Sequence, residues 1–298
     1  MAGRLSPVAL AQLALAVVLL GSGWPVTKTA LLQGAAPIWF ALGRAGLSMV
    51  VATIVVAASG RLRVPRRIDV PALAALGLLQ LAGFFALAHA AVAWVPAGRT
   101  AILANATLIW TVPIALLVTR EAISARRWLA ALVSAAGVVV LIGPWAIDWR
   151  SGPALLGNGF LLGAALCWAA AMAIVRRCPP HQTMFQLLPW SFAIATLALL
   201  PLALGHDKGS WTGTGLTCLA MIGLVMGPIG TWCIMQATTV LPLVVASVGF
   251  LAGPALGLIL SVLWLGEPLT FSLAAGSVLL LGAAALAASG PADGEAKT

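Results

Sequence analysis

The sequence has very few charged residues for its length. Only 8% of its 298 residues are Asp, Glu, Lys or Arg, whereas 62% are hydrophobic. A soluble globular domain carries about 25% charged residues because its surface faces water. Apolar runs of about 20 residues, the length that spans a hydrocarbon core, recur along the chain. The composition therefore excludes an ordinary soluble domain and predicts an all-α membrane protein; the long runs without alternation exclude a β-barrel.

Acidic residues are missing from the centres of the apolar runs. The seven in the chain fall at the ends of these runs, in loops or in the tail: Asp69, Glu121, Asp148, Asp207, Glu267, Asp293 and Glu295. A protein that exchanges protons for cationic drugs usually needs a carboxylate deep in the membrane. The sequence argues against that class, and it leaves open whether His89 carries a coupling proton.

Paired metal-ligand spacing is missing as well. The four cysteines are scattered, mostly inside apolar runs, as Cys167, Cys178, Cys218 and Cys233. Buried free cysteines usually behave as small core residues. We therefore expect no metal and no cofactor. The chain also shows no nucleophile–base pair, which disfavours an integral-membrane enzyme such as a lipid-modifying transferase.

The apolar runs predict ten membrane spans joined by short connections. We expect them at residues 8–32, 37–59, 71–89, 96–118, 127–144, 154–175, 183–203, 213–235, 240–264 and 270–288. The first run is too long for a signal peptide and lacks a cleavage pattern, so we interpret it as a span. The tail, residues 289–298, is expected to be disordered.

Basic residues are distributed unequally between the two sides of these spans. With a cytoplasmic N-terminus, the inner side holds Arg4, Arg61, Arg63, Arg66, Arg67, Arg120, Arg126, Arg127, Arg176, Arg177 and Lys297. The outer loops hold only Arg150 and Lys208. Because cytoplasmic loops are enriched in Lys and Arg, both termini are predicted to be cytoplasmic. The same rule explains the net charge of +9 without a nucleic-acid partner.

One unit occurs twice. Pro96 begins an apolar helix that ends 25 residues later at Glu121, and Pro242 begins another that ends 25 residues later at Glu267. Five spans per half require the halves, residues 8–144 and 154–288, to have opposite orientations. Inverted repeats of this kind recur in secondary transporters. We interpret Glu121 and Glu267 as anchors at helix ends on opposite membrane faces.

Three basic residues lie inside the predicted spans. Lys28, Arg44 and Arg99 all fall in the external half when depth is counted at about 1.5 Å per residue, and His89 joins this layer. Charges at such depth usually face a cavity. They predict a positive outer vestibule that attracts a carboxylate or another anion. Alternatively, Lys28 and Arg99 reach the interface, and Arg44 pins a helix end.

Polar and aromatic side chains near mid-depth are the predicted substrate residues. They are Trp24, Gln80, Asn105, Trp110, Trp168 and Ser247. A buried amide such as Asn105 needs a partner from a neighbouring helix or a ligand. A tryptophan-lined cavity suits aromatic or amphipathic solutes. Simple helix packing is an equal alternative for Trp110.

These features resemble the drug/metabolite transporter superfamily, EamA type. The similarity rests on Trp24 and Lys28 late in the first span, Arg44 in the second, and the repeated unit with its Leu265–Gly266–Glu267–Pro268 ending. The Ala104–Asn105–Ala106–Thr107 stretch looks most like the YddG-type exporters of aromatic and other neutral amino acids. The resemblance implies a basket of helices around a central cavity, with spans 5 and 10 to one side. It also implies that Trp24, His89, Asn105, Trp168 and Ser247 line that cavity.

The sequence thus predicts a bacterial inner-membrane exporter of amino acids. Its expected partners are the small-molecule substrate and the lipid bilayer. Export of phosphorylated or nucleotide-linked metabolites is the first alternative, and it would need several cations deep in the cavity. The glycine-rich faces can pack within one chain or between two, and a monomer is the simpler expectation.

Overall fold

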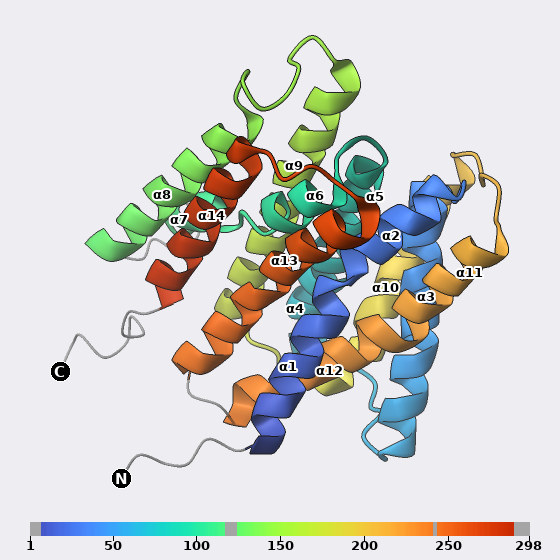
Figure 1. The fold of residues 1–298 in the computed structure, drawn as a ribbon. Coiled ribbons are helices and arrows are strands. Elements are labelled where there is room, and N and C mark those ends of the chain that lie inside the picture. The colour runs from blue at the N-terminus through green and yellow to red at the C-terminus, as the bar shows by residue number, and fades with distance from the viewer. Residues whose placement is uncertain (1–6, 117–123, 241–242, 289–298) are drawn as a thin grey trace.

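The computed structural model describes residues 7–116, 124–240 and 243–288, and it describes side chains throughout these ranges except at residues 234–250. Apart from one isolated β-bridge between Ala35 and Gly209, the regular secondary structure in these ranges is helical, which confirms the predicted all-α fold (Figure 1). In chain order the helices are α1 (Pro7–Gly21), α2 (Gly23–Leu32), α3 (Pro37–Ala58), η1 (Arg67–Asp69), α4 (Val70–Ala74), η2 (Ala75–Gly83), α5 (Phe84–Trp94), α6 (Ala97–Leu103), α7 (Leu108–Ile114), α8 (Ala125–Ile142), α9 (Gly152–Arg177), α10 (Met184–Leu204), α11 (Gly213–Ala220), η4 (Met221–Met226), α12 (Gly227–Val240), α13 (Leu243–Leu265) and α14 (Phe271–Ala288).

Eight helical segments of the described residues are long and apolar enough to cross a membrane. They are Pro7–Leu32, Pro37–Ala58, Arg67–Trp94, Ala125–Ile142, Gly152–Arg177, Met184–Leu204, Gly213–Cys233 and Phe271–Ala288. Each overlaps one of the ten predicted spans. The other two predictions, residues 96–118 and 240–264, correspond to α6 with α7 and to α13.

The prediction of one continuous helix from Pro96 was wrong. The chain leaves the helix after Leu103 and re-enters it at Leu108. At the break, the backbone N–H of Asn105 bonds the carbonyl of Ile102 at 3.1 Å, and the side-chain amide of Asn105 bonds Ala101 O at 2.7 Å. Asparagine side chains compete in this way with helical hydrogen bonds. The far end of the predicted helix, at Glu121, lies outside the described residues.

Two π-helical segments begin at matching positions in the two halves. Ala75 begins η2 and Met221 begins η4, and these positions are 146 residues apart, as are Pro96 and Pro242. A Cβ added at Gly77 in η2 would lie 2.6 Å from the Cβ of Ile194 in α10. One added at Gly223 in η4 would lie 2.6 Å from the Cβ of Leu47 in α3. Each π-helical segment therefore packs against the long helix of the other half.

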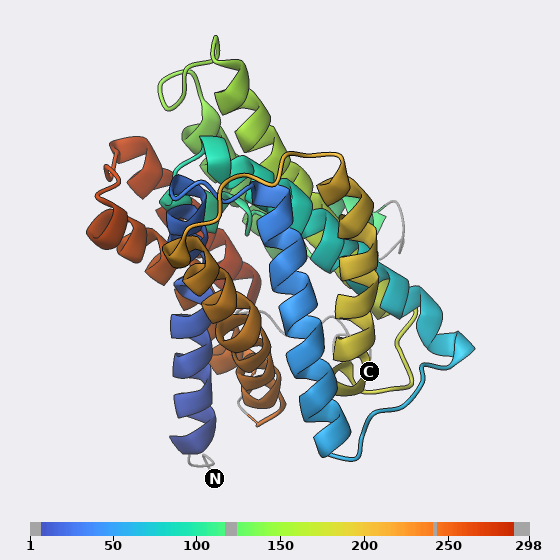
Figure 2. The same cartoon turned by 90° about the vertical axis from the view of Figure 1, so that its right-hand side faces the viewer.

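Helices α3 and α10, which receive these contacts, pack against each other. Figure 2 shows α3 between α12 and α10, and both neighbours contact it. Ser48 of α3 adds a buried hydrogen bond to Gly223 O at 2.9 Å. The missing glycine side chains allow these backbones to approach closely, as is common in membrane bundles.

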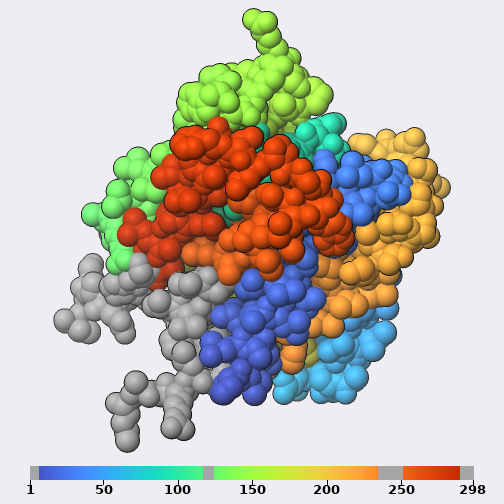
Figure 3. Space-filling model, viewed as in Figure 1, coloured from blue at the N-terminus to red at the C-terminus, as the bar shows by residue number. Residues whose placement is uncertain are grey.

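Helices α8 and α14 pack together to one side of the bundle (Figure 1). The surface view shows α13 beside α1, with α14 on the other side of α13 (Figure 3). Helices α1 and α13 approach closely, because a Cβ on Gly257 would lie 2.9 Å from Gly21 O.

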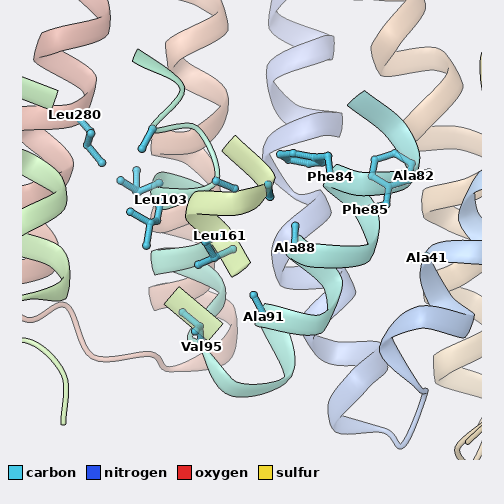
Figure 4. Packing of buried hydrophobic residues seen from close by; sticks show 14 of the residues in the cluster. Ala41, Ala82, Phe84, Phe85, Ala88, Ala91, Val95, Leu103, Leu161 and Leu280 are labelled. Carbon is cyan, nitrogen blue, oxygen red and sulfur yellow. The ribbon is translucent and has the colours of Figure 1, made fainter. Parts of the chain in front are cut away.

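The main hydrophobic core joins the central helices. Ala88 and Ala91 of α5 face α9 and its Leu161, while Leu103 of α6 and Leu280 of α14 belong to the same cluster (Figure 4). The small alanine side chains let α5 and α9 pack closely. This core holds the short helix α6 at the centre of the protein, where all its residues are buried.

The bundle has two unlike ends. We call the end at which α1 begins and α14 ends the basic end, since the loops with Arg61, Arg63 and Arg66 also lie there; it is the lower end in Figure 1. The connections at residues 33–36, 143–151, 205–212 and 266–270 lie at the opposite end.

Candidate substrate cavity

A cavity of about 410 Å³ lies beside the break between α6 and α7. Its polar and aromatic lining comes from Asn105, Thr107, Thr111, Arg127, Trp168 and Arg176. Its apolar wall comes from α6, α7, α13 and α14, and the cavity extends to Ala288 at the basic end. The volume lies in the range of small-molecule sites.

The interruption of the helix supplies the polar part of this cavity. Asn105 is exposed, whereas the neighbouring residues of α6 are buried. Its amide nitrogen donates to Ala101 O at 2.7 Å. Because a carbonyl only accepts, this bond fixes which side of the amide is nitrogen and leaves the oxygen as an acceptor.

Trp168 supplies the aromatic part. This residue lies in the middle of α9, and its ring meets Phe84 edge-on, with the centroids 5.2 Å apart. The contact orients the indole, while the side chain stays only half-buried and lines the cavity. An aromatic solute could therefore pack against a ring that is already held in place.

Trp24 and His89 lie outside the cavity, in a row of aromatic rings that continues from Trp168. Phe84 packs against Trp24 with the centroids 6.1 Å apart, and Trp24 packs against His89 at the same distance. His89 then contacts Phe40 at 5.8 Å. The row connects the cavity with the part of the bundle beneath the opposite end.

His89 is fully buried and holds Arg44. Its Nδ1 donates to Phe85 O at 2.8 Å, and its Nε2 lies 3.4 Å from the guanidinium of Arg44. The guanidinium also lies 4.1 Å above the Phe85 ring. Since a guanidinium can only donate, this arrangement fits a neutral imidazole that accepts at Nε2.

Lys28 and Arg99 bond carbonyls near the opposite end. Lys28 Nζ donates to Val92 O at 2.6 Å and to Val95 O at 3.3 Å, at the C-terminus of α5. A cation stabilises that end of a helix dipole. Arg99 is 8% exposed and donates to Ala146 O at 3.2 Å. Neither residue lines the cavity.

Glu267 joins the two halves at the same end. Its carboxylate accepts hydrogen bonds from the backbone N–H groups of Ala97 at 2.6 Å and Gly98 at 2.9 Å. These are the first two residues of α6, so the negative charge lies at the positive end of that helix. Glu267, at the end of the second predicted unit, thus caps the N-terminus of α6, the helix that begins the first unit.

The remaining predicted residues lie elsewhere. Trp110 donates from Nε1 to Leu162 O at 3.0 Å and packs between α7 and α9. Gln80 lies in the π-helical η2, and its buried Oε1 has no hydrogen-bond partner among the described residues. The Ser247 side chain and Glu121 lie outside what is described.

Sequence reasoning missed Arg127 and Arg176 as cavity residues, because it assigned them to cytoplasmic loops. Arg127 falls in the first turn of α8, where a cation opposes the helix dipole, but Arg126 shares this position, so the sequence could not tell which of the two lines the cavity. Arg176 lies in the last turn of α9, a favourable position for a cation that gives no signal of a cavity role.

The described residues contain no group of three or more His, Cys, Asp or Glu that could hold a metal ion.

The family model for EamA-like transporters matches the chain twice, at residues 8–143 and 155–289. The chain belongs to the EamA-like transporter family. It is therefore a multi-pass membrane transporter, and the predicted superfamily is confirmed.

Known proteins agree with this assignment. An uncharacterized transporter of Clostridium kluyveri is 27% identical over 72% of this chain and 70% of its own length. The uncharacterized transporter YdfC of Bacillus subtilis is 26% identical over 84% of this chain and 81% of its own. A riboflavin transporter of Vibrio cholerae is 28% identical over 41% of this chain and 39% of its own. A protein of known crystal structure shares the fold, with a TM-score of 0.61 and 19% identity over 91% of this chain and 97% of that one.

Proposed function

We propose that this transporter exports amino acids, aromatic and other neutral ones, from cytoplasm to periplasm across a bacterial inner membrane. The observation that carries this proposal is the cavity in which the ring of Trp168 and the amide of Asn105 meet. An aromatic side chain can pack on the indole, while the backbone part of the same amino acid reaches the amide.

The cavity would load from the basic end, which we place in the cytoplasm. Lysine and arginine are concentrated in cytoplasmic loops of membrane proteins. The cavity extends to that end, where Arg176 is exposed. At the opposite end, Glu267 bonds the N-terminus of α6, and Lys28 of α2 bonds the C-terminal turn of α5. This arrangement fits a conformation that opens to the cytoplasm.

Export would follow by exchange of conformation between two inverted halves. The 146-residue offset of η2 and η4, and their crossed packing against α10 and α3, support this view. Related halves of opposite orientation can adopt each other's arrangement, which opens a central site first to one side and then to the other. A solute would then pass the aromatic row and the basic residues Arg44 and Lys28.

A second candidate is a larger aromatic metabolite. Arg127 and Arg176 on the cavity wall supply cations that the sequence prediction had placed only in loops. Guanidinium groups bind carboxylates and phosphates. The riboflavin transporter of Vibrio cholerae, although similar over less than half of this chain, has an aromatic solute in its name. These observations favour a flavin-like or phosphorylated aromatic compound as the alternative substrate.

Counterflow in proteoliposomes tests the proposed function. Vesicles loaded with unlabelled phenylalanine should accumulate labelled phenylalanine, and Trp168→Ala or Asn105→Ala should reduce its uptake. A panel with leucine, riboflavin and a sugar phosphate separates the candidates. Accumulation of riboflavin alone would replace amino acids by the second candidate, and counterflow that neither substitution affects would remove the cavity from the mechanism.

A further inference from the structure

Four exposed arginines lie close together between α3 and α4, at the basic end of the bundle. They are Arg61, Arg63, Arg66 and Arg67. We call residues 61–68 the arginine loop; in Figure 2 it begins below α3. It joins two helical segments that are long and apolar enough to cross a membrane, Pro37–Ala58 and Arg67–Trp94. Because a residue adds at most about 3.6 Å to an extended chain, so short a connection keeps its arginines near the bilayer surface.

Large apolar side chains alternate with these arginines and are exposed as well. Leu62 and Val64 follow the first two arginines, and Ile68 follows the last. Val64 is 76% exposed and Ile68 is 65% exposed. Apolar surface of this size is unfavourable in water. A mixture of basic and apolar side chains is typical of segments that lie in the membrane interface, with the apolar groups at the acyl chains and the cations at the headgroups.

The second half of the chain fixes the backbone of the arginine loop. Trp190 of α10 donates from Nε1 to Arg63 O at 3.0 Å. Gln182, in the connection between α9 and α10, donates from Nε2 to Val64 O at 2.9 Å. The loop is therefore held from the protein side, while its arginine side chains stay exposed. A surface that is ordered before it binds loses less conformational entropy on binding.

The acidic residue beside the arginines is bound by backbone groups. Asp69 is fully buried and accepts hydrogen bonds from the backbone N–H groups of Arg66 at 2.9 Å, His181 at 2.6 Å and Gln182 at 3.1 Å. In the part of the chain that the structure describes, no carboxylate pairs with the guanidinium groups of the loop. These groups can therefore bind an anion from outside the chain, and phosphate oxygens match their donor geometry.

We propose that the arginine loop is a binding site for an anionic phospholipid. Its guanidinium groups contact the headgroup phosphate, and its exposed apolar side chains pack against the acyl chains. The leaflet on the side of the basic end supplies this lipid. Charge complementarity selects an anionic over a zwitterionic lipid, because an anionic leaflet attracts clusters of arginine that lie next to a membrane span. No residue of the loop lines the substrate cavity, so the inference goes beyond the proposed function and holds for any transported solute.

Quenching of a fluorophore on the loop by brominated lipids tests the preference. The full-length protein, with its four cysteines replaced by serine, carries the fluorophore at Val64→Cys. It is reconstituted into vesicles of equal parts phosphatidylglycerol and phosphatidylcholine, in which one lipid or the other is brominated. Phosphatidylglycerol should be enriched beside the fluorophore by at least about fivefold, the ratio expected for one arginine near an anionic surface. Equal quenching by the two lipids, or quenching by neither, would overturn the inference.

A second label position provides the control. Phe271 begins α14 at the opposite end, and its side chain is 88% exposed. A fluorophore at Phe271→Cys should be quenched equally by the two brominated lipids. The same excess of phosphatidylglycerol at both positions would show a general enrichment around the protein and would overturn the assignment to the loop.

Substitutions locate the preference within the loop. Arg63→Gln and Arg66→Gln should each lower it by about fivefold, whereas Arg63→Lys should retain most of it because lysine keeps the charge. Arg150→Gln removes one charge from an exposed position at the opposite end and should leave the preference unchanged. Equal losses in Arg150→Gln and in the loop variants would show a general charge effect and overturn the assignment.

Two further measurements identify what occupies the arginines. Inorganic phosphate, added at constant ionic strength, should not reduce quenching by brominated phosphatidylglycerol, because it offers no acyl chains to the loop. Displacement of the lipid by inorganic phosphate would overturn lipid binding in favour of a soluble anion. Combining Glu121→Gln, Asp293→Asn and Glu295→Gln, at the acidic positions outside the described residues, should leave the preference unchanged. A preference that appears only in this combined variant would mean that the chain's own carboxylates occupy the arginines, and it would overturn the inference.

Discussion

The two ends of the bundle differ in how the chain holds them together. At the opposite end, charged side chains bond backbone groups of distant helices, as Glu267 does with Ala97 and Lys28 with Val92. At the basic end, Asp69 ties two loops by accepting from His181 N at 2.6 Å and Gln182 N at 3.1 Å, on the side of α4 and α10. The cavity lies on the other side, beside α7, α8 and α14. Closure at one end thus accompanies a cavity that reaches the other.

Among the substitutions considered, removal of the Glu267 carboxylate should have the largest effect on transport, because it weakens the contacts at the opposite end. Glu267→Ala deletes two charge-assisted hydrogen bonds, each worth about 1.5–3 kcal/mol. We expect uptake of labelled phenylalanine to fall by about tenfold or more, because the opposite end loses two hydrogen bonds that join the halves. Asp148→Ala, which removes a carboxylate from an exposed loop at the same end, should leave uptake unchanged.

Reagent accessibility shows whether the loss comes from opening. In a background with the four cysteines replaced by serine, Ala97→Cys should resist a membrane-impermeant thiol reagent because Ala97 is fully buried. Adding Glu267→Ala should make this cysteine react from the side of the opposite end. Equal resistance in both proteins would mean that Glu267 does not hold that end closed.

The cavity itself provides the next comparison. Trp168→Ala removes the ring that lines the cavity, whereas Trp264→Ala removes one that is 53% exposed on α13. Loss of a central aromatic contact typically costs about 2 kcal/mol or more in binding. We expect phenylalanine binding to weaken by at least about tenfold in the first variant and to stay unchanged in the second. Similar values for the two variants, measured by scintillation proximity, would remove Trp168 from the site.

The sequence predicted the membrane fold and the family, because both depend on periodic apolar runs and on motifs that lie close together in the chain. It did not predict the break at Asn105, because two weak helix formers, Asn105 and Thr107, lie inside an apolar stretch that is otherwise long enough for one continuous span. It also missed the cavity role of Arg127 and Arg176. Their sequence positions match the rule for cytoplasmic loops, and only the packing of α7, α9 and α14 brings them to one cavity.

The contacts of η2 with α10 and of η4 with α3 allow a test of whether the two halves pack equivalently, with a smaller expected effect, on thermal stability. Gly77→Ala and Gly223→Ala would each force a Cβ to within 2.6 Å of a neighbouring Cβ. Overpacking of this kind costs about 1–3 kcal/mol. Both variants should lower the midpoint of thermal unfolding in detergent by similar amounts, whereas Gly159→Ala, which meets nothing within 4 Å, should not. A decrease in only one of the two glycine variants would contradict equivalent packing in the two halves.

The most direct test asks from which side the cavity is reached and whether solute fills it. Thr111 is exposed and lines the cavity, so it can carry a reporter cysteine in the serine-replaced background. The impermeant thiol reagent should modify Thr111→Cys from the side of the basic end and not from the other side. Phenylalanine should slow this modification. Modification from the other side alone, or a rate that phenylalanine does not change, would contradict a solute cavity that opens at the basic end.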